Sequence, residues 1–356
     1  MRFLRNIWYV AAWADEIAGD TLLPRTLLDE RILFFRDTQG EIQAIADRCP
    51  HRFAPLHMGR HEGDTVRCGY HGLAFDGRGR CVHNPHGSGA IPRSAAVQCY
   101  PVTQRHGAIW IWMGDPVLAD PDAIPDFHFN DPDRYIVAKR YLHVKANYML
   151  ETDNIMDLSH IQYLHPGTLG SDNVSTATIE LLQDGDTIWS KRLVHAERLP
   201  DFLYKANGIA PGTIVDRWID VRWDAPANMV LYVGAVPAGQ DTGDRRGRPI
   251  THHFTPETQT TSHYWFANSY PESMGEAGVQ VAQAHIDALN RPFADEDLPM
   301  LEAQQNMMGE ADFWALKPIL LPSDAPGIRA RRVLARLIAA EESGAQVRKP
   351  ASAAGC

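Results

Sequence analysis

The chain has 356 residues, a hydrophobic content of 44% and a formal net charge of −10. That length accommodates two domains, and the apolar content excludes global disorder. The negative charge argues against broad binding to nucleic acid or to an anionic membrane, and no apolar run approaches the ~18 residues of a membrane span. The N-terminal residues lack the apolar stretch of a signal peptide, and the five cysteines are an odd number. We therefore expect a cytoplasmic protein whose thiolates serve a metal, in preference to a secreted disulfide scaffold.

The first third of the chain predicts a small, mostly antiparallel β domain over residues 1–115. Apolar, strand-sized runs occur at 31–35 and 42–46, and residues 108–113 are rich in aromatic and β-branched side chains. The segment 115–125 contains three prolines and several aspartates, which indicates a linker.

A larger domain of mixed helix and sheet is predicted over residues 116–343, so the fold class is α+β. Periodicity favours strands at 187–194, 216–223, 229–236 and 260–267, and helices at 278–289 and 328–342. The last helix is amphipathic; its charged face is either solvated or binds a partner. Residues 344–356 are expected to be a disordered tail.

One group of candidate metal ligands lies in the β domain. Cys49-Pro50-His51 and Cys68-Gly69-Tyr70-His71 form a C-x-H and C-x-x-H pair with sixteen residues between the halves. A structural zinc accepts two cysteines and two histidines, but zinc motifs usually group like ligands together. Each half here supplies one cysteine and one histidine. That division favours a Rieske [2Fe–2S] cluster, with both cysteines on one iron and both histidines on the other.

A second group begins at Asn154. On a continuous helix Asn154, Asp157 and His160 would share a face, because they are three residues apart. His165 would be rotated off that face, but Pro166 follows at once, so we expect the helix to end or distort near His165. Both imidazoles could then meet at one metal.

The carboxylate that completes this group should come from a distant segment. Two histidines and one carboxylate form the facial triad of non-haem Fe(II) oxygenases, which leaves positions open for O₂. Asp297 is the first choice and Asp295 the second. Asp157 could then accept the remaining N–H of His160 or of a cluster histidine, although it could also be a plain surface aspartate.

With these motifs, the chain resembles the oxygenase components of the Rieske O-demethylases, the vanillate and dicamba demethylase group. The resemblance covers nearly the whole length. Its matching segments are 6–12, 49–56, 68–73, 81–87, 153–160, 255–258 and 297–305.

The resemblance implies an N-terminal Rieske domain, resembling a β-sandwich, and a C-terminal helix-grip (START-like) domain with an antiparallel sheet. It also implies a head-to-tail homotrimer and electrons from NAD(P)H through a reductase, with or without a ferredoxin. Asp157 would bridge His160 to His71 of the partner subunit and carry electrons between the two metal centres. The four Cys and His residues would hold the cluster, and His160, His165 and Asp297 the iron.

The same resemblance suggests substrate-binding candidates, namely His252, Leu231 and Ile155. His252 matches a cavity histidine of the dicamba-type enzymes, whereas Leu231 stands where those enzymes have an amide. A substrate carboxylate buried against Leu231 would be poorly paired, which favours a less acidic substrate such as an anilide or a neutral aryl ether.

The expected reaction is oxidative dealkylation, in particular O-demethylation, of a small substituted aromatic. Three other interpretations stay open. The same metals could carry out N-dealkylation, hydroxylation or cis-dihydroxylation; the chain could be a zinc-stabilised binding protein; or it could be a Rieske electron carrier only.

Overall fold

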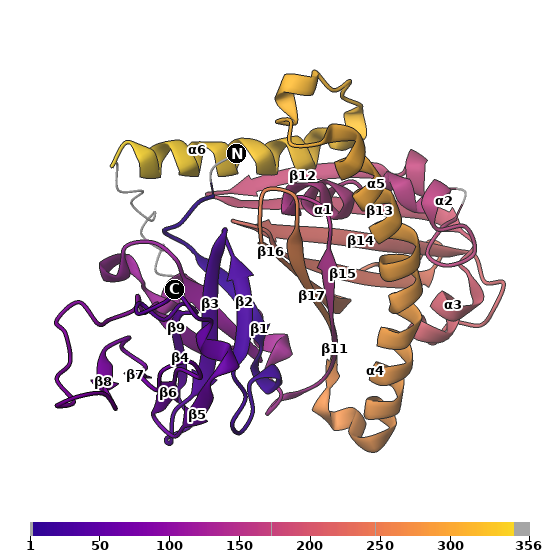
Figure 1. Ribbon diagram of the computed structural model, residues 1–356. Helices are drawn as coiled ribbons and strands as arrows, with labels where there is room; N and C mark the ends of the chain where they lie inside the picture. Colours follow the sequence, from indigo (N-terminus) through magenta and orange to yellow (C-terminus); the bar gives the residue numbers. More distant parts are fainter. Residues whose placement is uncertain (1–2, 172, 246, 345–356) are drawn as a thin grey trace, which may run out of the picture. The chain divides into compact units, whose positions relative to one another are not determined.

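The computed structural model describes residues 3–171, 173–245 and 247–344, which form two compact units (Figure 1). The first unit contains residues 5–126 and the short segment 255–259. The second contains most of the chain after residue 127. The units therefore divide at residue 126, within the region after the three-proline segment. Apart from Gly344, the predicted tail lies outside the described residues.

The first unit consists of three small antiparallel sheets, as the sequence predicted. Its core contains Leu33, Phe35 and Phe75, which are fully buried, and it also takes in the thiols of Cys49 and Cys68. Each large side chain buried in this way contributes roughly 1.5–3 kcal/mol. In spatial order the sheets are β1 (Trp8–Trp13), β10 (Ala108–Trp112) and β9 (Val102–Arg105); β2 (Leu23–Leu27), β3 (Glu30–Arg36) and β4 (Ile42–Ala46); and β5 (Arg60–Glu62), β6 (Thr65–Arg67), β7 (Ala74–Asp76) and β8 (Cys81–His83).

The second unit contains a seven-stranded sheet in which β11 and β17, and the successive strands from β12 to β16, pair antiparallel. The four strands predicted from the sequence are present, together with β11, β12 and β16, which were not predicted. In spatial order the sheet contains β11 (Tyr135–Val144), β17 (Ser262–Pro271), β16 (Arg248–Pro256), β15 (Asn228–Pro237), β14 (Val215–Asp224), β13 (Thr187–Glu197) and β12 (Thr178–Asp184).

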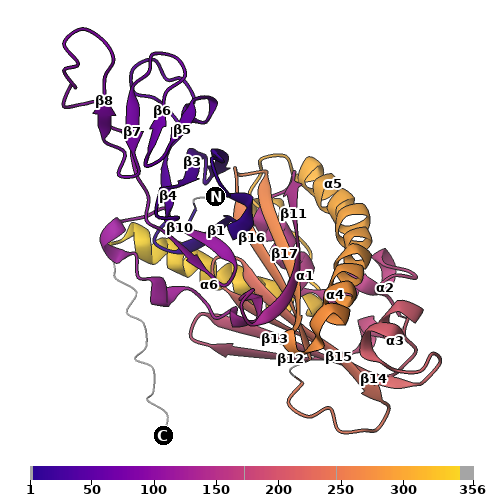
Figure 2. The same cartoon turned by 90° about the horizontal axis from the view of Figure 1, so that it is seen from below.

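Helices accompany this sheet. α4 (Gly275–Asn290) runs beside β11 and β17 (Figure 2). It approaches β11 so closely that a Cβ at Gly278 would lie 2.6 Å from Ile136 Cδ1, which explains a glycine inside a helix. α6 (Ala325–Glu342) packs on β13 and contacts α1 (Tyr148–Met156). Both predicted helices, 278–289 and 328–342, are thus confirmed.

Three further helices complete the unit: α2 (Ile161–Leu164), α3 (Asp201–Asn207) and α5 (Leu298–Met308). The α+β fold class is confirmed. Among the described residues, none of the helices has both the length and the apolarity to cross a bilayer.

Candidate metal centres

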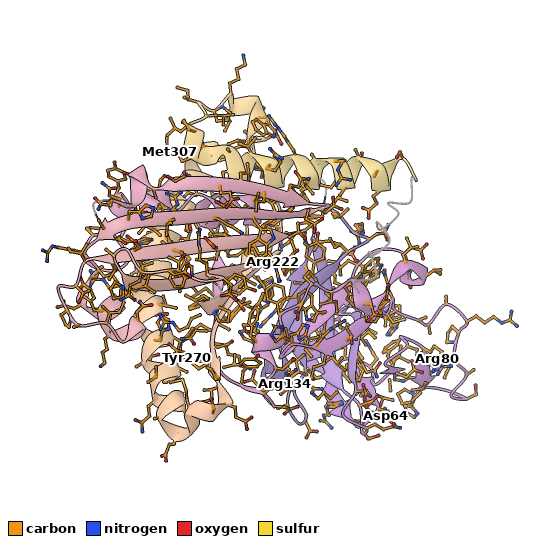
Figure 3. The ribbon with its side chains drawn as sticks, turned by 180° about the vertical axis from the view of Figure 1, so that it is seen from behind. Asp64, Arg80, Arg134, Arg222, Tyr270 and Met307 are labelled. Atoms are coloured by element: carbon orange, nitrogen blue, oxygen red, sulfur yellow. The ribbon has the colours of Figure 1, made fainter. Side chains whose placement is uncertain are left out.

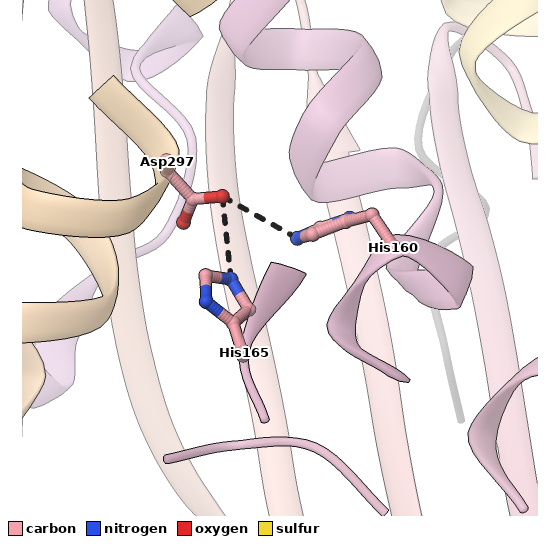
Figure 4. A group of neighbouring side chains, drawn as sticks. All are labelled: His160, His165 and Asp297. Carbon is pink, nitrogen blue, oxygen red and sulfur yellow. Dashed lines mark ion pairs between the residues drawn. The ribbon is translucent and has the colours of Figure 1, made fainter. Parts of the chain in front are cut away.

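His160, His165 and Asp297 converge in the second unit (Figure 4). The Nε2 atoms of His160 and His165 lie 3.5 and 3.3 Å from Oδ1 of Asp297. Among the described residues, this is the one group that brings three such ligand atoms within 4.8 Å of one another. Asp295, the second choice from the sequence, is exposed and is not part of the group.

The chain reaches this arrangement through a break at Asp157. Helix α1 ends at Met156, and Asp157 has an extended backbone, with φ −111° and ψ 94°. Its carboxylate accepts the N–H of Ser159 at 2.9 Å, which caps a short 3₁₀ turn, η6 (Leu158–His160). The expected single helix face through Asn154, Asp157 and His160 is therefore wrong, because the Asp157 cap starts a new turn.

Asp297 is presented by an irregular helix. α4 continues into a π-helix, η9 (Arg291–Asp297), before α5 begins. Such π segments are rare and often occur at functional sites, because they rotate the following side chains. Asp297 is the last residue of this segment and its side chain is 6% exposed.

Hydrogen bonds fix the orientation of both imidazoles. Nδ1 of His160 donates to the backbone carbonyl of Asp157 at 2.7 Å, and Nδ1 of His165 donates to Oε2 of Glu296 at 2.7 Å. The protons thus reside on the Nδ1 atoms, which leaves the Nε2 lone pairs directed at Asp297. Asn154 Nδ2 donates to Asp297 Oδ1 at 2.9 Å and orients that carboxylate.

The charges around the triad fit a bound cation. Burial lowers the pKa of His160, although Asp297 partly offsets it. Burial acts in the same direction on His165, but Asp297 and Glu296 outweigh it and raise the pKa of this imidazole. Nε2 of His165 is buried and its contact with Asp297 lacks hydrogen-bond geometry. A metal ion would satisfy this atom, and two imidazoles with a carboxylate are a donor set that suits Fe(II).

Asp157 does not hold His160 in the way that the sequence suggested. Its backbone carbonyl, and not its carboxylate, accepts the N–H of His160. The carboxylate binds the Ser159 N–H and lies 3.4 Å from Nη2 of Arg192. Within one chain, the carboxylate is therefore occupied by a cap and a buried arginine.

A largely apolar cavity adjoins the triad. Of the substrate-binding candidates, Ile155 and Leu231 line it. His252 is not among the lining residues; it is fully buried, its Nδ1 lies 2.7 Å from the Tyr264 hydroxyl, and Phe293 packs against its ring. Burial lowers the pKa of His252 to about 3, so it is neutral. Lining residues that the sequence did not single out include Arg217, Arg248 and His285.

In the first unit, two loops of the same backbone geometry carry the four predicted cluster ligands, Cys49, His51, Cys68 and His71. In each loop the cysteine N–H donates to the carbonyl five residues later, and the cysteine carbonyl accepts from the N–H four residues later, at 2.8–3.0 Å. The residues at that fourth position, Phe53 and Gly72, have φ of +60° and +74°. A Cβ at Gly69 would lie 2.8 Å from the Met58 carbonyl oxygen, so this loop needs glycine.

The four side chains lie as two pairs. Cys49 and Cys68 are 2% exposed and interact with each other, and burial raises the pKa of the Cys49 thiol to about 11. The rings of His51 and His71 lie 4.5 Å apart, nearer the surface. A thiol pair inside and an imidazole pair outside fit a cluster with two cysteines on one iron and two histidines on the other. A single zinc would need all four at one point.

Comparisons with known proteins agree with the presence of both kinds of metal centre. The Rieske [2Fe–2S] domain matches residues 7–101, and the vanillate O-demethylase oxygenase C-terminal domain matches residues 144–340. The chain is 38% identical to the iron-sulfur subunit of the toluene-4-sulfonate monooxygenase system of Comamonas testosteroni, over 96% of this chain and 99% of that protein. It is 37% identical to the oxygenase component of chloroacetanilide N-alkylformylase of Rhizorhabdus wittichii, over 95% and 97% of the two chains.

A solved structure gives the same result. The crystal structure of dicamba monooxygenase with non-haem iron and dicamba matches with a TM-score of 0.77 at 34% identity, over 97% of this chain and 100% of that chain. A Rieske unit followed by a catalytic unit with a His–His–carboxylate group defines an iron-dependent oxygenase. The chain belongs to the Rieske oxygenases whose catalytic domain is that of vanillate O-demethylase.

Membership of this family decides the cofactors. The protein is a monooxygenase that carries one [2Fe–2S] cluster and one mononuclear iron per chain and uses O₂. These predictions from the sequence are confirmed. The interpretations as a zinc-stabilised binding protein and as a bare electron carrier do not fit an oxygenase catalytic domain over residues 144–340.

Proposed function

We propose that this chain is the terminal oxygenase of a multicomponent system that removes an alkyl group from a substituted aromatic, with O-demethylation as the main reaction. The observation that carries this proposal is the convergence of His160, His165 and Asp297 beside an apolar cavity. Electrons come from NAD(P)H through a separate reductase, with or without a ferredoxin, in a cytoplasmic catabolic pathway for aromatic or xenobiotic compounds.

In this proposal Cys49, Cys68, His51 and His71 hold the cluster, and the triad holds the iron. When bound, the two centres supply electrons and the oxidation of an alkyl C–H bond. The hydroxylated alkyl group then leaves as an aldehyde, because a hemiacetal or hemiaminal collapses spontaneously. The chain itself contributes ligand orientation through Asn154 and Glu296, and an apolar surface that excludes water.

The apolar lining positions the aromatic ring. Ile155 and Leu158 from the segment that carries the iron ligands, Leu231 from β15 and Phe293 from the π-helix contribute to this lining. Such a surface gives a ring a dry, shaped place beside the metal, so that one alkyl carbon is held towards it.

A homotrimer is part of the proposal. Because Asp157 directly precedes the turn that carries His160, we propose that it conveys electrons from His71 of the partner subunit to the iron of its own chain. Its side chain is 21% exposed, so the carboxylate can accept an N–H from outside the chain.

N-dealkylation is the second candidate. The 37% identity to a chloroacetanilide N-alkylformylase oxygenase supports it, and the apolar cavity suits either reaction. Product analysis separates the two: methoxybenzoates and N-alkyl anilides are incubated with a reductase, NAD(P)H and ¹⁸O₂. Aldehyde release from aryl ethers supports O-demethylation. Release from anilides alone supports N-dealkylation, and no oxygenated product from either class contradicts the proposal.

A further inference from the structure

Among the described residues that line the cavity beside the triad, Arg248 is a cation that no acidic residue balances. Arg248, on β16, is half-buried and lines this cavity. Its Nη1 donates to the carbonyl of Ala206 at 2.8 Å and to the hydroxyl of Tyr270 at 3.2 Å. Its Cζ also lies 5.9 Å from the centre of the Tyr270 ring, but among the described residues no carboxylate forms an ion pair with it, and its Nε and Nη2 atoms have no hydrogen-bond partner.

The other cavity arginine is already balanced. Nη2 of Arg217 lies 2.7 Å from Oε1 of Glu197, and both side chains are almost fully buried. Nη1 of Arg217 donates to the Leu169 carbonyl at 3.2 Å. Because the Glu197 carboxylate already balances the charge of the Arg217 guanidinium, this ion pair has no net charge to attract an anionic ligand. Arg248 is the cation available to a ligand.

Arg248 is held in place by a directional chain of hydrogen bonds. Since arginine can only donate, the Tyr270 oxygen accepts from Arg248 and the Tyr270 hydroxyl donates to Nδ1 of His285, at 2.8 Å. Burial and the charge of Arg248 lower the pKa of His285 to about 3, so the imidazole is neutral. Tyr270, on β17 near α4 (Figure 3), thus fixes Arg248 without neutralising it.

The register of the strands locates this cation within the cavity. Leu231 on β15 pairs with Ile250 on β16, and Val233 pairs with Arg248. Because residues two apart on a strand point to the same face, Arg248 lies on the same face of the sheet as Leu231, one cross-strand pair further along. On the opposite wall, His285, Leu289, Phe293 and Asp297 line the cavity at intervals of four residues. These four residues follow one another along α4 and the π-helix η9. The apolar side chains of Leu289 and Phe293 therefore separate the Arg248 and His285 end from the triad.

We propose that Arg248 is an oxyanion subsite, so that the substrate is an aromatic acid, a carboxylate or a sulfonate, with its oxidisable alkyl group directed at the triad. This deepens the proposed function and rests on it. The aromatic ring packs against Leu231 and Phe293, and the acid group reaches the free Nε and Nη2 edge of Arg248. A neutral substrate would leave that guanidinium desolvated and unpaired, which is unfavourable, whereas an oxyanion gains charge-assisted, bidentate hydrogen bonds.

Leu231 now has a different meaning from the one that the sequence suggested. An apolar residue at position 231 would disfavour an acidic substrate only if the acid group of the substrate lay directly against it. With the acid group one row away at Arg248, Leu231 contacts the ring, and an acidic substrate is fully compatible with it.

The test compares matched ligands in the resting enzyme without a reductase, so that binding is measured apart from turnover. The probes are 4-methoxybenzoate, toluene-4-sulfonate and the neutral 4-methoxybenzamide. Arg248→Met should weaken binding of the preferred acid by about tenfold to hundredfold and leave the amide within about twofold. Arg248→Lys should recover part of the loss, because it keeps the charge without the bidentate edge.

Arg222→Met is the matched control. Arg222 is a half-buried arginine of the same sheet (Figure 3) that pairs with Asp224 at 2.8 Å and does not line the cavity. The Arg222→Met enzyme should bind all three probes with the affinities of the wild type. The preferred acid, carboxylate or sulfonate, identifies the substrate class.

The proposal is overturned if wild-type enzyme binds the benzamide as tightly as both acids, a result that needs no variant. It is also overturned if Arg248→Met weakens the acid and the amide equally, which would mean a structural role. Turnover with a reductase is scored separately. If neutral ethers release aldehyde and the enzyme binds acids no better than the amide, the proposed function stands and the Arg248 subsite is rejected. If the enzyme binds acids selectively but forms no oxygenated product, the subsite stands and the proposed function is rejected.

Discussion

Glu296 accepts a hydrogen bond from Nδ1 of His165 at 2.7 Å, and the same carboxylate oxygen accepts the hydroxyl of Thr168 at 2.8 Å. His165 is thereby locked with Nε2 facing Asp297. A carboxylate behind a metal-bound histidine fixes its tautomer and raises its basicity. Because Glu296 immediately precedes Asp297, one turn of π-helix supplies both a predicted iron ligand and the residue that orients another.

We therefore expect Glu296→Ala to weaken iron binding at the triad by about tenfold to hundredfold without disturbing the cluster. The measurement is iron titration of the metal-depleted triad, with the reduced Rieske EPR signal recorded on the same sample. Glu302→Ala is a suitable control, because Glu302 accepts the backbone N–H of Lys145 and takes no part in the triad. Unchanged iron affinity in Glu296→Ala would refute the orienting role.

Asp157→Asn should retain both metals and lose turnover by about tenfold to hundredfold. An asparagine side-chain oxygen can still accept the Ser159 N–H, so the cap that shapes the His160 turn survives. What is lost is the negative charge beside His160 and Arg192. Iron content, cluster EPR and aldehyde release are measured together, and full activity in a metal-replete variant would rule out the electron-conveying role.

Much of the site could be read from the sequence because its ligands come in short, fixed spacings. The Cys49 and Cys68 loops each contain a complete local motif, and the pair His160 and His165 lies within one turn-and-helix segment. The carboxylate of the triad was harder to predict, because Asp295 and Asp297 lie two residues apart and both were candidates. The π-helix decides which of them faces the two histidines. Glu296 was missed for the same reason, because helical spacing does not reveal a π segment.

The strands that the sequence did not reveal lack a buried periodicity. β11 is half-exposed along almost its whole length, and β12 is mostly exposed. β16 contains Pro249 and two consecutive histidines, His252 and His253, which argue against a strand although both histidines are buried. Arg248 was missed with it, because only the register of β16 against β15 reveals which of its side chains face the cavity.

Buried neutral His252 should make the fold sensitive to acid. Burial depresses its pKa from an ordinary 6.5 to about 3, so between these values the unfolded chain binds the proton and the folded chain does not. Stability is therefore fully present above pH 6.5 and falls with decreasing pH, by up to about 1.4 kcal/mol per unit from this group. Urea midpoints at pH 7.5 and 5.5 should show a smaller acid loss in His252→Asn than in wild type; parallel losses would contradict this account.

Metal removal should act on the two centres differently. The side chain of His160 is 22% exposed and the triad adjoins a cavity, whereas the thiols of Cys49 and Cys68 are 2% exposed within the core of the first unit. A chelator should therefore remove the mononuclear iron while the Rieske EPR signal persists, and activity should disappear as the mononuclear iron is lost.

Adding Fe(II) should restore turnover. Zinc should occupy the same ligands, since it accepts two histidines and a carboxylate, but leave the enzyme inactive because it has no redox chemistry. Loss of the Rieske signal before loss of the mononuclear iron would show that the cluster is the more accessible centre.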